Sequence, residues 1–438
     1  MKSMTMKRVL QLSGVVLVCG ATAVFAQTGQ YLPATIANTP AALQAHQIQG
    51  EYFGISEAGD TLGAWVVANA NNSYTVSLLP GGLVKLPGQT TGGNWGGVLR
   101  YTGTGTWNAT TNAYAVTTAS GFSTTSITGT DYNRMLNGTT SGGSPFSLQR
   151  VHRRSPTLGL KPKASWGEAQ RWFDSAAAAV NPAAELAKWV QNNTTPQLNG
   201  GYLYRGVRTV ATHGAGYLHL EVMQPFRPSA RDQDRGNSGV YLHSKYEAQV
   251  LDSFGKSLAL NEMGAIYGVK PAAINATLPP MNFQTYDIFF TPRTSGTNGS
   301  LPGAAVMTVY LNGVLVQDST PVPVTTEAGF SGSQLNAGAL FLQDHGNNVV
   351  YNNIWFIPIN ASSHQELRNA LPMDSILAHA GVPVSLHPSV NRTREWARGA
   401  SASDRFFDLT GRRIEHAENP AVPVLRAPTS EQTPEQTR

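Results

Sequence analysis

The stretch Asn237-Ser238-Gly239-Val240-Tyr241-Leu242-His243-Ser244-Lys245-Tyr246-Glu247-Ala248-Gln249-Val250-Leu251-Asp252 predicts a strand, a short break and a second strand. Alternate side chains of a strand point to opposite faces, so Glu247 and Gln249 are expected on one face. Tyr246, Ala248 and Val250 are expected on the other. A carboxylate and an amide opposite an apolar face are typical of a β-sandwich that lines a polar cleft. A half-buried strand facing water would give the same alternation, so the pattern alone leaves both interpretations open.

Further strands are predicted on both sides of this stretch, within residues 198–360. Leu218, Leu220 and Val222 alternate with polar residues in 216–223, which places His219 and Glu221 on one face. More β-like runs lie at 285–290, 305–310, 338–342 and 351–357. The Asn-Gly pair at 312–313 predicts a tight hairpin turn, because both positions favour positive φ. Many antiparallel strands with little helix indicate an all-β sandwich of two packed sheets.

The region before this sandwich divides into a leader, a small β domain and a linker. Residues 27–45 form a polar leader without a predicted element, and short β-like runs separated by turn residues predict an all-β domain over 46–150. Residues 151–197 form a linker that begins with a basic segment. In this linker Asn181-Pro182 predicts a helix start, with helix over 183–191.

The first 26 residues predict export. A positively charged start is followed by the apolar run Val9 to Ala26, which ends in an A-x-A-like pattern. We therefore expect a signal peptide at 1–26 and a periplasmic or extracellular protein. Cys19 is the single cysteine and lies in this segment. Its removal would exclude disulfides, thiol catalysis and zinc–thiolate sites from the mature chain.

Charge and tail composition add little about function. The formal charge of +5 falls to +2 once Lys2, Lys7 and Arg8 are removed, so no electrostatic case for nucleic acid exists. No later apolar run is long enough to span a membrane. Residues 361–438 form a C-terminal extension whose end is predicted to be partly disordered. The run 406–414 is similar to a short hairpin of bacterial sorting modules, although a plain tail is the safer interpretation.

The sandwich region resembles the 3-keto-disaccharide hydrolase family, whose members have a concanavalin A-like jelly-roll fold. The resemblance rests on motifs that follow the family's order from Gly236 to Trp355: 236–242, 246–255, 264–267, 311–314, 342–346 and 353–355. The 46–150 region is similar to a domain with a Gly-Glu-Tyr-x-Gly motif that precedes the sandwich in some members. Departures from the family pattern are Ser175 after Phe-Asp, Phe283 in place of Trp, and Met263 in place of a small residue.

The resemblance implies cleavage of 3-keto-glycosides. A ketone at C3 acidifies the C2 hydrogen, so a base can remove it, an enolate forms, the C1 substituent leaves and water adds. This route needs a base, donors for the enolate oxygen and an acid for the leaving oxygen. It differs from hydrolysis by two carboxylates that flank an oxocarbenium-like centre. Residue spacing alone does not choose between the two routes.

Glu247 is the leading candidate for the base or for a metal ligand, because it lies mid-strand beside Gln249. Asp252 is a second candidate, although a strand-end turn residue is an equally simple reading. Glu221 is a further candidate, whereas His219 is more simply a surface histidine. The neighbours Asp344 and His345 form an acid–imidazole pair whose side chains could also diverge. The candidate catalytic residues are Glu247, Asp252, His345 and Glu221; the candidate substrate-binding residues are Asn237, Gln249, Tyr267, Lys245, Asp344 and His243.

Two other function classes stay open at this point. A carbohydrate-binding module without catalysis would use the same jelly-roll fold, and a structural exported protein would leave its polar face unused. A catalytic site is expected to hold at least one carboxylate with a raised pKa in a cleft. The expected partner is a carbohydrate or glycoside. A divalent cation is left open as a cofactor, and no metal ligand is assigned beyond Glu247 as a candidate.

Overall fold

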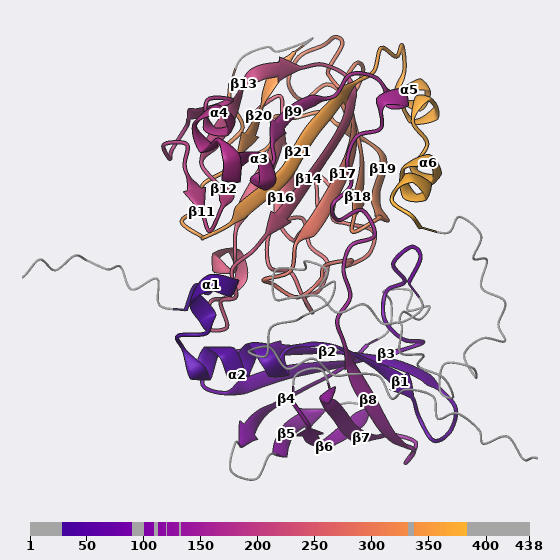
Figure 1. The fold of residues 1–438 in the computed structure, drawn as a ribbon. Helices are drawn as coiled ribbons and strands as arrows, with labels where there is room; N and C mark the ends of the chain where they lie inside the picture. The colour runs from indigo at the N-terminus through magenta and orange to yellow at the C-terminus, as the bar shows by residue number, and fades with distance from the viewer. Residues whose placement is uncertain are drawn as a thin grey trace, which may run out of the picture.

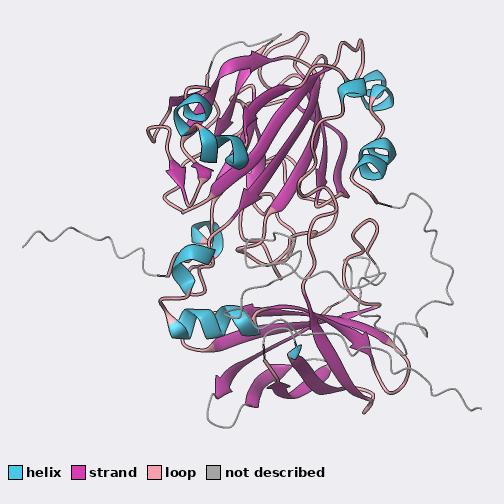
Figure 2. Ribbon diagram, in the orientation of Figure 1, coloured by secondary structure: helices cyan, strands magenta, loops and turns pink. Residues whose placement is uncertain are grey.

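The computed structural model describes residues 29–89, 100–108, 113–119, 121–130, 133–331 and 337–382. The expected signal peptide at 1–26 and the expected hairpin at 406–414 lie outside these residues. Figure 1 shows two β-rich parts, one above the other, joined by the chain that leaves β8. Strands dominate both parts, with a few short helices at their edges (Figure 2). The all-β fold predicted from the sequence is confirmed.

The N-terminal part is an antiparallel sheet with the strand order β5-β4-β3-β2-β1-β8-β7-β6. Its elements are α1 (Pro33–Ile36), α2 (Pro40–Ile48), β1 (Gly50–Ile55), β2 (Thr61–Ala68), β3 (Ser73–Pro80), β4 (Tyr101–Asn108), β5 (Ala113–Ala119), β6 (Phe122–Thr128), β7 (Met135–Thr140) and β8 (Pro145–Val151). The supposed polar leader contributes both helices. Ile36 and Ile48 from these helices are buried with Tyr52, Val66 and Leu148 of the sheet.

A connector runs from the first sheet to the sandwich and contains β9 (Gln170–Phe173), α3 (Ser175–Val180) and α4 (Pro182–Leu186). The predicted helix start is confirmed, since the Asn181 side chain accepts a hydrogen bond from the Ala184 amide. The predicted continuation of the helix to residue 191 is wrong. Trp189 begins β10 (Trp189–Gln191) and pairs with Thr209 of the sandwich, so sheet pairing overrides local helix propensity there.

The sandwich consists of two antiparallel sheets with the orders β10-β13-β20-β15-β16 and β11-β12-β21-β14-β17-β18-β19, and β9 pairs with β21. Its strands are β11 (Leu198–Asn199), β12 (Tyr202–Tyr204), β13 (Val207–His213), β14 (Gly216–Met223), β15 (Ser238–Leu242), β16 (Tyr246–Val250), β17 (Gln284–Thr291), β18 (Ala305–Leu311), β19 (Val314–Val322), β20 (Gly338–Leu342) and β21 (Val350–Pro358). The predicted turn between β18 and β19 is confirmed, because Asn312 and Gly313 have φ values of 51° and 75°.

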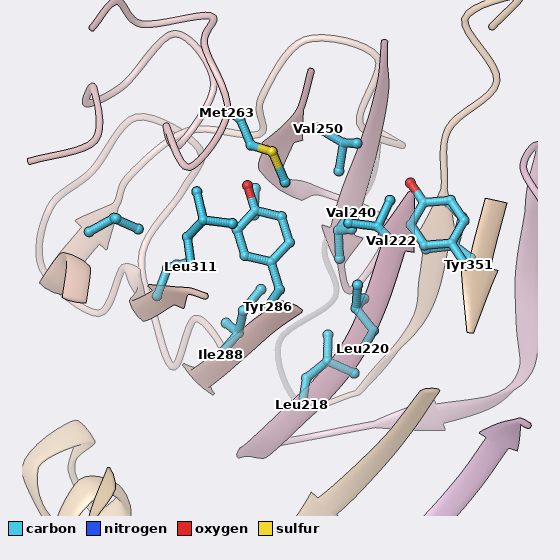
Figure 3. Packing of buried hydrophobic residues seen from close by; sticks show 14 of the residues in the cluster. Leu218, Leu220, Val222, Val240, Val250, Met263, Tyr286, Ile288, Leu311 and Tyr351 are labelled. Carbon is cyan, nitrogen blue, oxygen red and sulfur yellow. The ribbon is translucent and has the colours of Figure 1, made fainter. Parts of the chain in front are cut away.

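The core lies between the two sandwich sheets. Leu218, Leu220 and Val222 of β14 face Val240 of β15 and Val250 of β16 (Figure 3). The same buried cluster continues into the N-terminal sheet through Phe53, Trp65 and Val67. Two short helices, α5 (His364–Ala370) and α6 (Met373–His379), pack Leu367 and Ile376 on the outer face of the larger sandwich sheet. The outer face of the smaller sheet is where Glu247 lies.

Candidate active site

One row of paired residues crosses four strands of the smaller sandwich sheet. Glu247 of β16 pairs with Tyr241 of β15, which pairs with Phe341 of β20, which pairs with Arg208 of β13. Residues paired directly across strands share a face of the sheet. The adjacent row, which faces the other way, supplies the core residues Val207, Leu342, Val240 and Ala248. Glu247 therefore lies on the face outside the sandwich core, as the sequence alternation predicts.

The Glu247 carboxyl is buried, and burial disfavours its charged form. The residue is only 2% exposed. Burial raises the pKa of Glu247, a hydrogen bond with the Tyr241 hydroxyl partly offsets this and the negative charge of Glu327 adds to it, which together bring the pKa to about 8. A carboxyl with this pKa can exchange a proton near neutral pH, which is the property required of a general base or acid.

Gly239 provides the space that the Glu247 side chain occupies. A Cβ atom on Gly239 would lie 2.2 Å from Glu247 Oε1 and 2.6 Å from Tyr241 Cε2. Real Cβ contacts are never this short, so any side chain at position 239 would displace the carboxyl. The carboxyl thus leans from β16 across β15, against the ring of Tyr241.

Tyr241 is a hydrogen-bond donor beside Glu247. Its hydroxyl donates to the Glu327 carbonyl oxygen at 2.8 Å and accepts from Gln343 Nε2 at 3.2 Å. Burial, followed by the negative charge of Glu247, raises the pKa of Tyr241 far above its usual value, so the phenol stays protonated. The pKa of Tyr267 is also raised, by burial and then by Glu327 and Glu247, which places Tyr267 in the same electrostatic neighbourhood.

The segment 325–330 runs along the start of β16, on the edge opposite β15, and holds Lys245. The Glu247 amide donates to Thr326 Oγ1 at 3.1 Å, and the Thr326 amide donates to the Lys245 carbonyl oxygen at 3.0 Å. Lys245 Nζ donates to the Phe330 carbonyl oxygen at 2.7 Å, and burial lowers the pKa of Lys245. Lys245 therefore contacts the segment that borders Glu247.

Side-chain amides lie on the same face of the sheet as Glu247, beginning with Gln249 two residues further along β16. Gln249 Nε2 donates to Gln233 Oε1 at 2.9 Å and to the Asn261 carbonyl oxygen at 3.2 Å. Asn237 Nδ2 donates to the Gln233 carbonyl oxygen at 2.9 Å, and Gln233 Nε2 donates to the Asn261 carbonyl oxygen at 2.9 Å. Gln233 thus links Asn237 to Gln249, and the structure brings both of these predicted substrate-binding residues together with Glu247.

Asp252 has a different environment from Glu247. Its carboxylate forms a buried ion pair with Arg235, with an Arg235 Nη2 to Asp252 Oδ2 distance of 2.6 Å. The other carboxylate oxygen accepts from the Phe254 amide at 3.3 Å. Asp252 combines the strand-end role expected from its position with a charge partner that the sequence did not reveal.

Asp344 and His345 do not form the acid–imidazole pair considered in the sequence. Asp344 lies 3.0 Å from Arg205 Nε and accepts from Thr194 Oγ1 at 2.8 Å, whereas His345 is exposed. His243 is buried in the turn between β15 and β16, where its Nε2 lies 2.7 Å from the His213 carbonyl oxygen and its ring packs on Phe290. These residues lie around the sheet, and none has a contact with Glu247 among those described.

Glu221 and His219 lie on the other sheet, away from Glu247. His219 is fully buried, so the reading as a surface histidine is wrong. Its Nδ1 lies 2.7 Å from Asp287 Oδ1. Burial lowers the pKa of His219, but Asp287 and then Glu221 more than offset this and raise it to about 9. Glu221 accepts from the Gly159 amide at 2.7 Å, so this cluster fastens the connector to the outer face of the larger sheet.

Sequence reasoning missed four residues around Glu247: Tyr241, Gln233, Glu327 and Gln343. Tyr241 could have been found, because pairing two strands across the break at 243–245 puts it opposite Glu247. Gln233 lies in a short 3-10 helix before β15, Glu327 in the segment after β19 and Gln343 directly after β20, so none belongs to these two strands. Within the described residues, no group of three or more His, Cys, Asp or Glu is arranged to hold a metal ion.

The comparisons with known proteins concern the part of the chain that holds this site. Residues 177–357 match the model of the family described as "3-keto-alpha-glucoside-1,2-lyase-like domain". The matched segment makes up less than half of the chain. It contains both sandwich sheets and Glu247, which confirms the family resemblance and supports a role in acting on glycosides. No curated protein matches the chain.

Solved structures of candidate glycosyl hydrolases from Parabacteroides distasonis ATCC 8503 are similar to part of the chain. One is 27% identical, with a TM-score of 0.38, and the match covers 44% of this chain and 84% of that chain. A second is 16% identical, with a TM-score of 0.32, and the match covers 44% of this chain and 100% of that chain. The glycoside-directed role is based on the family match and on the geometry around Glu247.

Proposed function

We propose that the protein cleaves 3-keto-glycosides by elimination, with Glu247 as the base. The observation that carries the proposal is a buried carboxyl with a pKa of about 8, in contact with a protonated tyrosine on the face outside the sandwich core. The family match supplies the substrate class, since its description names 3-keto-α-glucosides and a lyase reaction across positions 1 and 2.

In the proposed reaction Glu247 removes the C2 proton as its carboxylate. The C–H electron pair becomes the enolate conjugated with the C3 ketone. The enolate then re-forms the ketone while a C1–C2 double bond forms and the C1–O bond breaks. The leaving oxygen takes a proton, which releases the alcohol and an unsaturated 3-keto sugar. Addition of water across the C1–C2 double bond gives the free 3-keto sugar, so the overall reaction equals hydrolysis.

The neighbours of Glu247 fit the other requirements of this route. The protonated Tyr267 hydroxyl is a donor for a developing oxyanion or for the leaving oxygen, and Tyr241 can do the same once its proton leaves the Glu327 carbonyl oxygen. Asn237 and Gln249 supply amides suited to sugar hydroxyls, held in position by Gln233. Each of these groups acts by donating or accepting hydrogen bonds, and Glu247 carries the proton.

Hydrolysis by two flanking carboxylates is less well supported. That mechanism needs a second carboxyl across the scissile bond from the first. Asp252 is neutralised by Arg235, and Glu221 lies on the outer face of the larger sheet in contact with the connector. Glu327, whose charge raises the pKa of Glu247, is exposed and belongs to the segment along the edge of β16. A single base with protonated donors is therefore the better match to the geometry.

The proposal is tested by incubating the native protein with a 3-keto-glucoside and with its unoxidised parent. We expect release of the alcohol from the 3-keto substrate alone. Glu247→Gln should lower kcat/KM by about a hundredfold or more, the usual share of general base catalysis. The matched control is Glu168→Gln, which changes an exposed carboxyl of the connector and should leave the rate unchanged. Sugar binding without turnover by the native protein would instead indicate a carbohydrate-binding module.

We also propose that the protein is exported, with a mature chain that begins near Gln27. The charged and apolar start of the sequence supports this proposal. No described helix is both long enough and apolar enough to cross a membrane. Mass spectrometry of the protein from the periplasm or medium should show a chain without Cys19. A chain that retains Met1 would contradict export with cleavage.

A further inference from the structure

A long loop joins β16, which carries Glu247, to β17, and its first part contacts the N-terminal sheet. The ring centroids of Phe254 in the loop and Trp65 in β2 are 6.1 Å apart at an interplanar angle of 61°. Both side chains are buried in the cluster that forms the sandwich core. The loop is therefore packed between the two parts of the molecule.

Gly255 makes the closest approach of the loop to the N-terminal sheet. Its φ of 72° lies in the left-handed region, and a Cβ atom on it would be 2.4 Å from Val67 Cγ2 of β2. Glycine is required at this position both for its conformation and for the contact. The loop backbone thus rests directly on β2.

Arg100, just before β4, fastens the same part of the loop by hydrogen bonds. One of its terminal nitrogens donates to the Gly255 carbonyl oxygen at 2.9 Å and to the Lys256 carbonyl oxygen at 3.3 Å, and the other donates to Ser257 Oγ. A guanidinium that bonds successive backbone carbonyls holds the path of a loop more firmly than a single contact would.

The fastened part of the loop continues into the amides beside Glu247. Ser253 Oγ accepts from the Met263 amide at 2.8 Å and donates to Glu262 Oε2 at 2.5 Å, so residues 253 and 262–263 are held together. The carbonyl oxygen of Asn261, the residue just before Glu262, accepts hydrogen bonds from the side chains of both Gln249 and Gln233. A displacement at Gly255 would therefore reach this carbonyl through a short chain of hydrogen bonds.

We propose that the N-terminal sheet is a positioning element of the active site, which acts through Val67, Trp65 and Arg100 on the loop 253–263. By fixing this loop, the sheet sets the place of the Asn261 carbonyl and hence of Gln249 and Gln233 beside Glu247. The proposal rests on the proposed function for its effect on rate. It gives a role to a part of the chain that lies outside the matched residues 177–357.

The test is a set of variants of the full chain at Gly255 and Val67. Gly255→Ala should push the loop off β2 and lower kcat by about a hundredfold, the size of loss that a 1 Å misplacement can cause. The double variant Gly255→Ala/Val67→Ala removes the clashing Cγ2 atom and should recover at least about a tenth of the native kcat. The matched control is Gly143→Ala in the turn between β7 and β8, whose φ is 82° but whose added Cβ meets nothing within 4 Å. It carries the backbone strain without the contact.

Amide hydrogen exchange provides a second measurement, which needs no substrate. In Gly255→Ala the amides of Met263 and Gly264 should exchange faster than in the native protein, and in the double variant they should regain protection. Unchanged exchange in Gly255→Ala would overturn the proposal, as would an equal loss of kcat in Gly143→Ala or in the double variant. If the native protein turns over no 3-keto-glycoside, the proposed function fails, and the exchange comparison still decides whether the sheet holds the loop.

Discussion

Replacing Glu247 with Gln should change how the stability of the protein depends on pH. Burial raises the pKa of Glu247 from 4.5 to about 8. Between these pH values the folded chain keeps a proton that the unfolded chain releases. The stabilising effect of the proton is therefore complete below about pH 4.5 and is lost as the pH rises through 8. Gln carries no titrating group, so this contribution should be absent from the variant.

The size of the effect follows from proton linkage. One group that binds a proton only in the folded state changes the free energy of unfolding by about 1.4 kcal/mol per pH unit. Between pH 5 and 8 the native protein should therefore lose about 4 kcal/mol more stability than Glu247→Gln. Other titrating groups are common to both proteins and cancel in the difference.

Urea unfolding at pH 5, 6, 7 and 8 measures this difference directly. The free energy of unfolding of the native protein minus that of Glu247→Gln should fall steadily across the series. Glu168→Gln, the exposed carboxyl control, should run parallel to the native protein. A difference that stays constant from pH 5 to 8 would refute the reasoning, because Glu247 would then have the same pKa in the folded and unfolded chains.

Three further predictions concern the site and its support. The kcat/KM of the native protein on a 3-keto-glucoside should rise about tenfold per pH unit below 8 and level off above it, because the base must lose its proton; a fall with rising pH would make Glu247 the acid instead. Gly239→Ala should lower kcat/KM by about a hundredfold, since its Cβ would lie 2.2 Å from the carboxyl. Gly142→Ala, whose Cβ would meet only Thr140 Oγ1 at 3.8 Å, is the control, and equal rates in the two variants would contradict the packing argument. Asp287→Asn should lower the free energy of unfolding by about 3–5 kcal/mol, because it leaves His219 without its main charge partner; unchanged urea unfolding would show that the pair does not stabilise the fold.

The sequence predicts the strands and their faces well because side-chain alternation is a local property. Residues 246–250 show this, since the face of Glu247 follows from its neighbours in the chain. Trp189 shows the limit, because a segment with a helix start becomes a strand when it pairs with Thr209. The helices of the leader were missed for a similar reason. Their apolar residues are few and are buried by packing on a sheet that comes later in the chain.

The site is predicted less completely than the fold because its partners are distant in sequence. Glu247 and Gln249 could be identified from one strand, whereas Glu327 and Gln343 approach them only through the folding of later segments. The hydrogen-bond partners that hold Asp344 and Glu221 were equally hidden. Arg205 pairs with Asp344, and the backbone amide of Gly159 in the connector donates to Glu221. Neither contact can be recognised from the residues that flank these carboxylates in the sequence. Residue type therefore suggested candidates, and only three-dimensional packing separated them.

The most direct test of the central claim follows the C2 hydrogen of a 3-keto-glucoside. Native protein and Glu247→Gln are compared on the substrate with hydrogen or deuterium at C2, while release of the alcohol is measured. The account predicts that the native protein releases the alcohol from the 3-keto-glucoside, more slowly with deuterium at C2, and that Glu247→Gln releases at least about a hundredfold less. Full activity in a correctly folded Glu247→Gln variant would contradict the assignment of Glu247 as the base.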